Sequence, residues 1–261
     1  NKKKRYQQCD IIKADNTSPI LKKSNTNKDE TTFYFIAHPD DWQLFMGSES
    51  FDYIKHKRPL VFIYISSGDS GRDHRYWTLR ENAAIESFKL LLPNKRAIKS
   101  TTIFGSKKIH TVKIGNNINY FFRLTDGKYL GDGFPLYKNK TLLKLFNGEI
   151  KDIKSVDGSN SFTKTEIVDT LKKILYRHRT KYTRIMAIDS GVDFNKRNGH
   201  SDHYVASKLA DIAIRDIPNC RAEIFEDYRT KHKPANNNDL ETEKMKCLFF
   251  PYDNYMIKTY N

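Results

Sequence analysis

Short runs of aromatic and aliphatic residues alternate along this chain with stretches in which apolar residues recur at helical spacing. Such runs are typical of strands buried on both faces of a sheet. They occur at residues 32–37, 60–65 and 184–188, with further β structure expected at 101–104 and 109–122. Helices are expected at residues 42–55, 76–92, 165–178 and 204–215. The alternation predicts an α/β fold: a single Rossmann-like domain whose mostly parallel sheet carries helices on both faces.

The length of the chain fits one such domain. Its 261 residues are enough to bury a sizeable core. Residues 1–30 are rich in Lys, Asn, Asp and Thr, so we expect a polar N-terminal arm there and the folded domain over residues 31–261. No stretch approaches the roughly 18–20 consecutive apolar residues that a membrane-spanning helix needs. We therefore expect one folded domain and no transmembrane segment.

The charge of the chain is strongly positive. Lys and Arg number 46 against 31 Asp and Glu, a formal net charge of +15. This excess favours anionic partners such as acidic glycans, anionic polymers, lipid headgroups or nucleic acid. The lysines are scattered apart from the run at residues 2–5, and no nucleic-acid-binding motif accompanies them. An anionic polymer or surface stays open as a partner, a plain solvated basic surface is the alternative, and no specific nucleic acid is predicted.

Neither the first residue nor the cysteines settle the compartment. The chain begins with Asn1 rather than Met, which fits export after removal of a leader, and a cytoplasmic location is the alternative. The three cysteines, Cys9, Cys220 and Cys247, have no C-x-x-C spacing. An odd number of cysteines is a poor disulfide framework, although one bridge could form in an exported protein.

A first polar cluster follows the strand expected at residues 32–37. His38, Asp40 and Asp41 come where this strand turns into a helix. Imidazole and carboxylate are ligands that Zn²⁺ accepts, and a catalytic zinc takes three protein ligands with one position open. His38 and Asp41, three residues apart at such a turn, can converge on one ion. The alternative is that Asp41 only caps the helix.

A second polar cluster follows the strand expected at residues 184–188, after a loop. His203, in the first turn of the next helix, would supply the third ligand, and His200 lies three residues earlier on the same face. The carboxyl ends of parallel strands meet at one edge of a sheet, so the two clusters are expected together there. Two surface histidines beside a helix start are the alternative. The sequence thus predicts one compact ligand set.

The two clusters carry a family resemblance. The sequence resembles the zinc-dependent N-acetyl-sugar deacetylases of the PIG-L/LmbE type, whose motifs A-H-P-D-D and H-x-D-H are present at residues 37–41 and 200–203. Weaker similarities are the turn at residues 67–71, the Arg80-Glu81 pair, and residues 123–127, where Thr125 replaces a proline. The similarity spans about residues 32–215, with a weaker similarity at residues 228–230.

The resemblance implies a function and a metal. It implies a Zn²⁺ held by His38, Asp41 and His203 in a hydrolase that removes the N-acetyl group from an N-acetylglucosamine-type amino sugar or its conjugate and releases acetate. Many members continue the first motif with Glu, whereas this chain has Trp42 and Gln43. That Glu is not a zinc ligand, so the departure affects the surroundings of the site and the transfer of a substrate identity.

The resemblance also implies roles for four further residues. Asp40 would be the general base, because adjacent side chains diverge and Asp40 stays off the metal when Asp41 binds it. His200 would stabilise the oxyanion or act as a general acid, and Arg80 would help to hold the sugar. Asp202 would orient one of the histidines as a hydrogen-bond acceptor; capping of the helix is its alternative.

Some neighbouring residues have two interpretations. Asp69, Arg72 and His74 lie in a polar loop after a strand and could line the substrate mouth, or they could form an ordinary surface turn. Trp42 and Trp77 could stack on a sugar ring, but core packing is the commoner role of a tryptophan near a helix start.

Three other functions compete with deacetylation. A zinc hydrolase could cleave another amide or a phosphoester, although phosphoesterases often use two metals and the sequence shows one compact ligand set. A non-catalytic glycan- or surface-binding module could keep the fold, but such a module predicts loss of the base, and Asp40 is present. A nucleic-acid binder has only the net charge in its favour.

Overall fold

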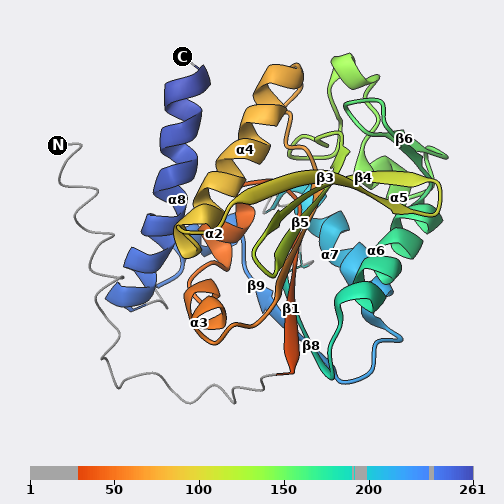
Figure 1. Ribbon diagram of the computed structural model, residues 1–261. Coiled ribbons are helices and arrows are strands. Elements are labelled where there is room, and N and C mark those ends of the chain that lie inside the picture. Colours follow the sequence, from red (N-terminus) through yellow and green to blue (C-terminus); the bar gives the residue numbers. More distant parts are fainter. Residues whose placement is uncertain (1–28, 190, 192–198, 235–237, 261) are drawn as a thin grey trace.

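A seven-stranded sheet forms the centre of the molecule, with strand order β3-β4-β5-β2-β1-β8-β9 (Figure 1). The computed structural model describes residues 29–189, 191, 199–234 and 238–260, so residues 1–28 of the expected arm lie outside the described residues. The strands of this sheet are β1 (Glu30–Ile36), β2 (Leu60–Ser66), β3 (Ala97–Phe104), β4 (Lys107–Ile114), β5 (Asn117–Leu124), β8 (Tyr182–Ile188) and β9 (Cys220–Phe225).

Most of the sheet is parallel. β1 pairs in parallel with β2 and β8, β2 with β5, and β8 with β9. The exception is the edge formed by β3, β4 and β5, where consecutive strands pair antiparallel. The predicted α/β class with a mostly parallel sheet is confirmed.

Helices cover both faces of the sheet (Figure 1). Side chains alternate in direction along a strand, so Phe33 and Phe35 pack on one face of β1 and Tyr34 and Ile36 on the other. The first face is covered by α5 (Leu142–Phe146), α6 (Lys164–His178) and α7 (Ser201–Ile214). The second is covered by α2 (Asp41–Phe45), α3 (Ser50–Lys55), α4 (His74–Leu91) and α8 (Asp239–Tyr260). Both faces are apolar, which explains why the strands read as continuous hydrophobic runs.

The single helix predicted over residues 42–55 is wrong, because this segment forms the two short helices α2 and α3. The break contains Gly47, where a Cβ would lie 2.7 Å from Leu248 Cδ1 and 2.9 Å from the Trp42 carbonyl oxygen. The chain therefore needs glycine where α8 crosses this turn. Trp42 itself is fully buried, with its ring centroid 5.0 Å from that of Phe62, so it packs in the core and does not face a sugar.

The C-terminal part adds elements that the apolar pattern did not indicate. β9 extends the sheet beyond β8, and α8 packs along α4. Smaller elements in the middle of the chain are β6 (Ile153–Lys154), β7 (Ser161–Phe162) and the 3-10 turn η1 (Pro135–Tyr137). A further 3-10 turn, η3 (Tyr228–His232), follows β9. Residues that contact the site come from α8 and from the segment after β9.

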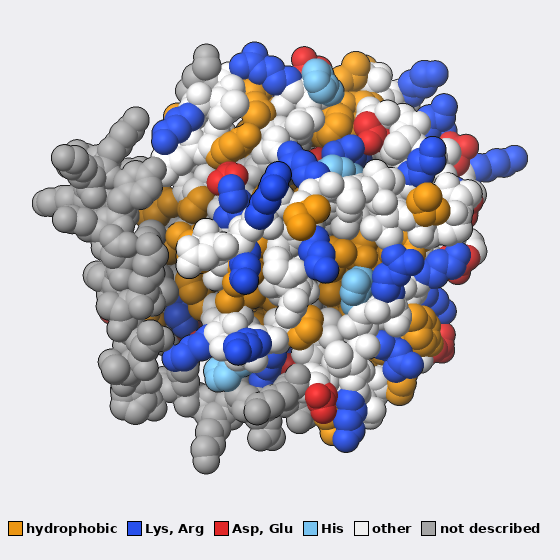
Figure 2. Space-filling view, in the orientation of Figure 1, with side chains coloured by type: hydrophobic (Ala, Val, Ile, Leu, Met, Phe, Trp, Pro, Cys, Tyr) orange, Lys and Arg blue, Asp and Glu red, His pale blue; other side chains and the backbone are white. Residues whose placement is uncertain are grey.

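Basic side chains are scattered over the visible face of the molecule. On the face seen in Figure 2, Lys and Arg side chains are spread among hydrophobic and uncharged ones. Among the described residues, no helix combines the length and the apolar character needed to cross a bilayer.

Candidate functional site

The structure brings His38, Asp41 and His203 together at the carboxyl end of the sheet. His38 follows β1, Asp41 is the first residue of α2, and His203 lies in the first turn of α7. The Nε2 atom of His203 is 3.2 Å from Asp41 Oδ1, and the Nδ1 atom of His38 is 3.6 Å from Asp41 Oδ2. The ligand atoms of all three residues lie within 4.8 Å of one another, and all three side chains are buried.

Asp41 does not act as a helix cap. The N-cap position of α2 is occupied by Asp40, which makes no capping hydrogen bond with its side chain. The Oδ2 atom of Asp41 instead accepts a 2.7 Å hydrogen bond from the backbone N–H of His38. This bond folds the turn so that the Asp41 carboxylate faces the two imidazoles.

Each of the two histidines is held by a carboxylate behind it. His203 Nδ1 donates to Asp227 Oδ2 at 2.9 Å, and His38 Nε2 donates to Asp202 Oδ2 at 3.1 Å. These contacts leave His203 Nε2 and His38 Nδ1 directed toward Asp41. Imidazoles that bind metals are commonly oriented in this way, with the outer N–H on a carboxylate. Two nitrogens and one oxygen form a donor set that fits a divalent metal such as zinc with one position open.

The electrostatics of this group favour positive charge between the side chains. Burial acts against a charged imidazole, but the Asp41 carboxylate and the hydrogen bond to Asp227 outweigh it and raise the pKa of His203 to about 9. Burial is similarly outweighed at His38, where Asp41, Asp202 and Asp126 hold the pKa well above its usual value. Burial would raise the pKa of Asp41, yet the two histidines hold it well below its usual range. A bound cation would meet the same field.

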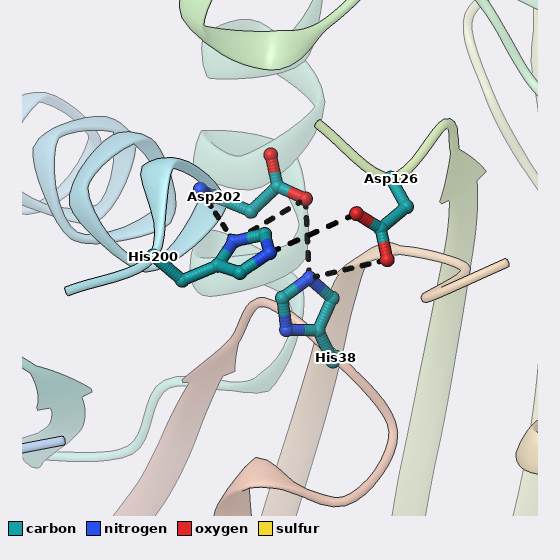
Figure 3. A group of neighbouring side chains, drawn as sticks. All are labelled: His38, Asp126, His200 and Asp202. Atoms are coloured by element: carbon teal, nitrogen blue, oxygen red, sulfur yellow. Dashed lines mark hydrogen bonds and ion pairs between the residues drawn. The ribbon is translucent and has the colours of Figure 1, made fainter. Parts of the chain in front are cut away.

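A second group of side chains shares His38, contrary to the single compact set expected from the sequence. It consists of His38, Asp126, His200 and Asp202, which point toward one another in Figure 3. Asp202 Oδ2 accepts from His38 and, at 2.9 Å, from the backbone N–H of Gly127. If Nδ1 of a neutral His38 binds a metal in the first group, its Nε2 carries the proton and donates it to Asp202. Nε2 then has no lone pair for a metal in the second group, so His38 can be a ligand in only one of the two groups. We interpret the second group as a network behind the first, held by the His38–Asp202 hydrogen bond and by longer ion pairs with Asp126.

His200 lies at the edge of this network and marks the start of α7. It is the N-cap residue, with Nδ1 accepting from the backbone N–H of Asp202 at 3.1 Å, so Asp202 does not cap the helix. The Nε2 atom of His200 lies 3.8 Å from Asp126 Oδ1. Burial and the nearby His38 charge lower the pKa of His200 to about 4. Because Nδ1 is occupied as an acceptor, Nε2 is the atom that can donate a proton or a hydrogen bond.

Asp40 is adjacent in sequence to Asp41 of the first group and is paired with Arg80. The Nη2 atom of Arg80 donates to Asp40 Oδ1 in a short ion pair, and the Asp40 side chain is 24% exposed. Arg80 also donates through Nη1 to the Gly68 carbonyl oxygen at 2.6 Å and through Nε to the Tyr252 hydroxyl at 2.7 Å. The described contacts of Arg80 thus hold the carboxylate that the sequence identified as the candidate base.

Gly68 permits this close approach. Its φ is +59°, in the left-handed region, and a Cβ there would lie 2.2 Å from Arg80 Nη1. A side chain at this position would therefore displace the guanidinium, and the conformation itself favours glycine.

Asp126 is anchored by the turn after β2. Its backbone N–H donates to Asp69 Oδ2 at 2.7 Å, and Asp69 Oδ1 accepts from the Gly71 N–H at 2.8 Å. Burial raises the pKa of Asp69 to about 6. Asp69 therefore stabilises the loop that carries Asp126. Arg72 and His74, in contrast, are exposed on the surface.

Glu81, the second residue of the Arg80-Glu81 pair, holds the end of β5, the strand before this loop. Arg123 donates through Nε and Nη2 to the two oxygens of Glu81 at 2.8 and 2.7 Å, and its guanidinium lies 5.0 Å from the Trp77 ring. Trp77 is buried under Arg123 and is not a surface platform for a sugar. Two neighbouring residues of α4 thus hold Asp40 and Arg123.

An aromatic edge completes the surroundings of His203. The Tyr228 ring stacks on the imidazole at a centroid distance of 5.5 Å, and Phe45 meets it edge-on at 6.0 Å. Tyr228 is 47% exposed, so it lies where the site opens toward solvent.

Sequence reasoning missed three residues of this arrangement. Asp227 follows β9, so recognising that strand would have revealed another acidic residue beyond a strand end. Asp126 belongs to residues 123–127, one of the weaker family similarities, but the resemblance implied no role for it. Tyr252 had no local signal, because it reaches Arg80 across 172 residues of sequence.

Several solved structures are similar to this one, among them the following two. A conserved protein of Thermus thermophilus has a TM-score of 0.47 and 14% identity, with 88% of this chain and 80% of that chain covered. The N,N'-diacetylchitobiose deacetylase of Pyrococcus horikoshii has a TM-score of 0.49 and 15% identity, with 98% and 82% covered. No curated protein sequence matches the chain.

The sequence itself gives the decisive comparison. Residues 33–214 match the family described as PIG-L, GlcNAc-PI de-N-acetylase. The matched segment runs from β1 to the end of α7 and includes His38, Asp40, Asp41, His200 and His203. Because it covers well over half of the chain, this protein belongs to the PIG-L family.

Proposed function

We propose that this protein is a zinc-dependent hydrolase that removes the N-acetyl group from an N-acetylglucosamine-type amino sugar or its conjugate. The observation that carries the proposal is the buried meeting of His38, Asp41 and His203, with Asp40 beside them and partly open to solvent. Membership of the PIG-L family supports the reaction type.

The chemistry divides between the ion and the side chains. When bound, Zn²⁺ lowers the pKa of water and polarises a carbonyl group. Asp40 takes the proton from the attacking water, since its carboxylate is exposed enough to reach it and Arg80 fixes its orientation. The guanidinium of Arg80 donates to Asp40, Gly68 and Tyr252, so its support of the sugar works mainly through Asp40.

His200 serves the other side of the reacting amide. Its Nε2 atom donates a hydrogen bond to the oxygen that becomes negative during attack, while Nδ1 stays on the helix backbone. Asp126, 3.8 Å from Nε2, steadies the imidazole in that orientation. Asp40 then gives the proton that it took from water to the leaving nitrogen, and cleavage of the C–N bond releases acetate and the free amine of the sugar.

The test is acetate release from a panel of compounds. The zinc-loaded protein is incubated with free, lipid-linked and polymeric N-acetylglucosamine compounds, in neutral and anionic forms, together with N-acetylated amino acids. We expect acetate and a free sugar amine from at least one amino-sugar compound, loss of both with a chelator, and recovery with added zinc. Release from N-acetylated amino acids alone would identify a hydrolase of another amide.

The same panel separates an enzyme from a binding module. A non-catalytic glycan-binding protein would retain N-acetylated glycans in a binding assay without releasing acetate at any zinc concentration. That outcome would contradict the proposed function. The pairing of Asp40 with Arg80 favours the enzyme, because a binding module has no need of an oriented carboxylate at this place.

Asp227 provides a test of the metal site from outside the ligand set. Replacing Asp227 by Asn should weaken zinc binding by about 10–100-fold, because the His203 imidazole loses its charged acceptor. The affinity is measured by competition with a chromophoric chelator. Asp152→Asn is the control, since Asp152 pairs with Lys140 on the surface and belongs to neither His/Asp group. Equal zinc affinities of the two variants would contradict the assignment.

A further inference from the structure

The C-terminal helix reaches the candidate base through one tyrosine. α8 lies outside residues 33–214, the segment that matches the family, yet its Tyr252 side chain is 5% exposed and enters the core beside the site. The Tyr252 hydroxyl accepts a 2.7 Å hydrogen bond from Arg80 Nε. The three groups Tyr252, Arg80 and Asp40 therefore form a continuous chain from α8 to the site.

Two hydrogen bonds fix the orientation of the Arg80 guanidinium, and its third contact is with Asp40. Nε is held by Tyr252 and Nη1 by the Gly68 carbonyl oxygen, and a guanidinium is planar, so these two contacts fix the direction of Nη2. Nη2 pairs with Asp40. Without the hydroxyl, a buried Nε–H would lack its acceptor, which favours rotation of the guanidinium away from Asp40.

Anchoring of α8 does not depend on the Tyr252 hydroxyl. Ser87 in α4 donates through Oγ to the Leu248 carbonyl oxygen at 2.6 Å, and Cys247 and Leu248 are buried in the same interface. The Tyr252 ring packs near Phe249 at a centroid distance of 5.8 Å. A phenylalanine at position 252 would keep this packing and remove only the hydrogen bond.

We propose that Tyr252 is a positioning residue for the deacetylation reaction, acting through Arg80 to aim the Asp40 carboxylate at the attacking water. This inference rests on the proposed function. It gives α8 a part in catalysis, although the helix contributes none of the metal ligands.

The first experiment compares Tyr252→Phe with Tyr255→Phe on the best substrate from the panel. Tyr255 lies on the same helix and packs at the edge of the same core. Loss of one hydrogen bond to a charged group should lower kcat by about 10-fold in Tyr252→Phe, with KM and zinc content changed less than about twofold. Tyr255→Phe should keep the kcat of the original protein. An unchanged kcat in Tyr252→Phe would overturn the inference.

A double-mutant cycle tests whether the effect passes through Arg80. Lysine at position 80 has no Nε–H of the guanidinium type, so Tyr252→Phe should cause no further loss of kcat in an Arg80→Lys background. If the two losses multiplied, Tyr252 would act independently of Arg80, and the inference would be wrong.

An NMR measurement that does not depend on turnover tests the role of Tyr252 separately from the proposed function. The Nε–H of Arg80 should give an NMR signal that exchanges slowly with solvent, is absent in Arg80→Lys, and exchanges at least about 10-fold faster in Tyr252→Phe. Failure of the original protein to hydrolyse any N-acetyl compound would reject the deacetylase assignment. An unchanged exchange rate in Tyr252→Phe would instead reject the positioning by Tyr252.

Discussion

Replacing Asp40 by Asn is expected to lower kcat by roughly 10²–10⁴-fold while zinc content stays at about one ion per chain. The amide is nearly the same size as the carboxylate and can still contact Arg80, but it cannot take a proton from water. The His38, Asp41 and His203 group is left intact, because Asp40 is not part of it. Steady-state acetate release and metal analysis of the same sample measure the two effects.

The matched control for this substitution is Asp216→Asn. Asp216 is 70% exposed and pairs with Lys172 on the surface, and such pairs contribute little to stability. This variant should keep full turnover. Full turnover in Asp40→Asn would show that another group accepts the proton, and the role of Asp40 would then be rejected.

Replacing His203 by Ala is expected to remove the metal and, with it, the activity. Zinc content should fall from about one ion per chain to below about one tenth after dialysis, because only two of three ligands remain. The substitution also leaves Asp41 and Asp227 buried without the imidazole between them, so the melting temperature should fall as well. Metal analysis and thermal unfolding measure the two effects.

His56→Ala serves as the control for this variant. His56 is exposed at the end of α3 and bonds only to the Asp52 carbonyl oxygen among the described contacts, so its loss should change neither zinc content nor turnover. Retention of a full zinc equivalent in His203→Ala would contradict the ligand set.

The sequence predicted the centre of the sheet because buried parallel strands have a distinctive composition. The runs at residues 32–37, 60–65 and 184–188 correspond to β1, β2 and β8, which have helices packed on both faces. The site residues His38, Asp41 and His203 follow from the same logic, because a strand end and a helix start fix their positions locally.

The rest depended on contacts that local patterns do not contain. α8 has few fully buried residues and carries Pro251 in its interior, so it lacks a clear apolar stripe. The break between α2 and α3 occurs where Leu248 of this helix meets Gly47, so missing α8 also hid the break. Asp227 and Tyr252 contact His203 and Arg80 from distant segments of the chain. The sequence around Asp227 and Tyr252 gives no indication of these contacts.

The carboxylate that steadies His203 lies outside the segment that matches the family. Residues 33–214 contain His38, Asp41 and His203, whereas Asp227 follows β9. A variant shortened to end before residue 227 would leave the His203 imidazole without that support. We therefore expect the family segment to need residues beyond its own boundary to bind a metal tightly.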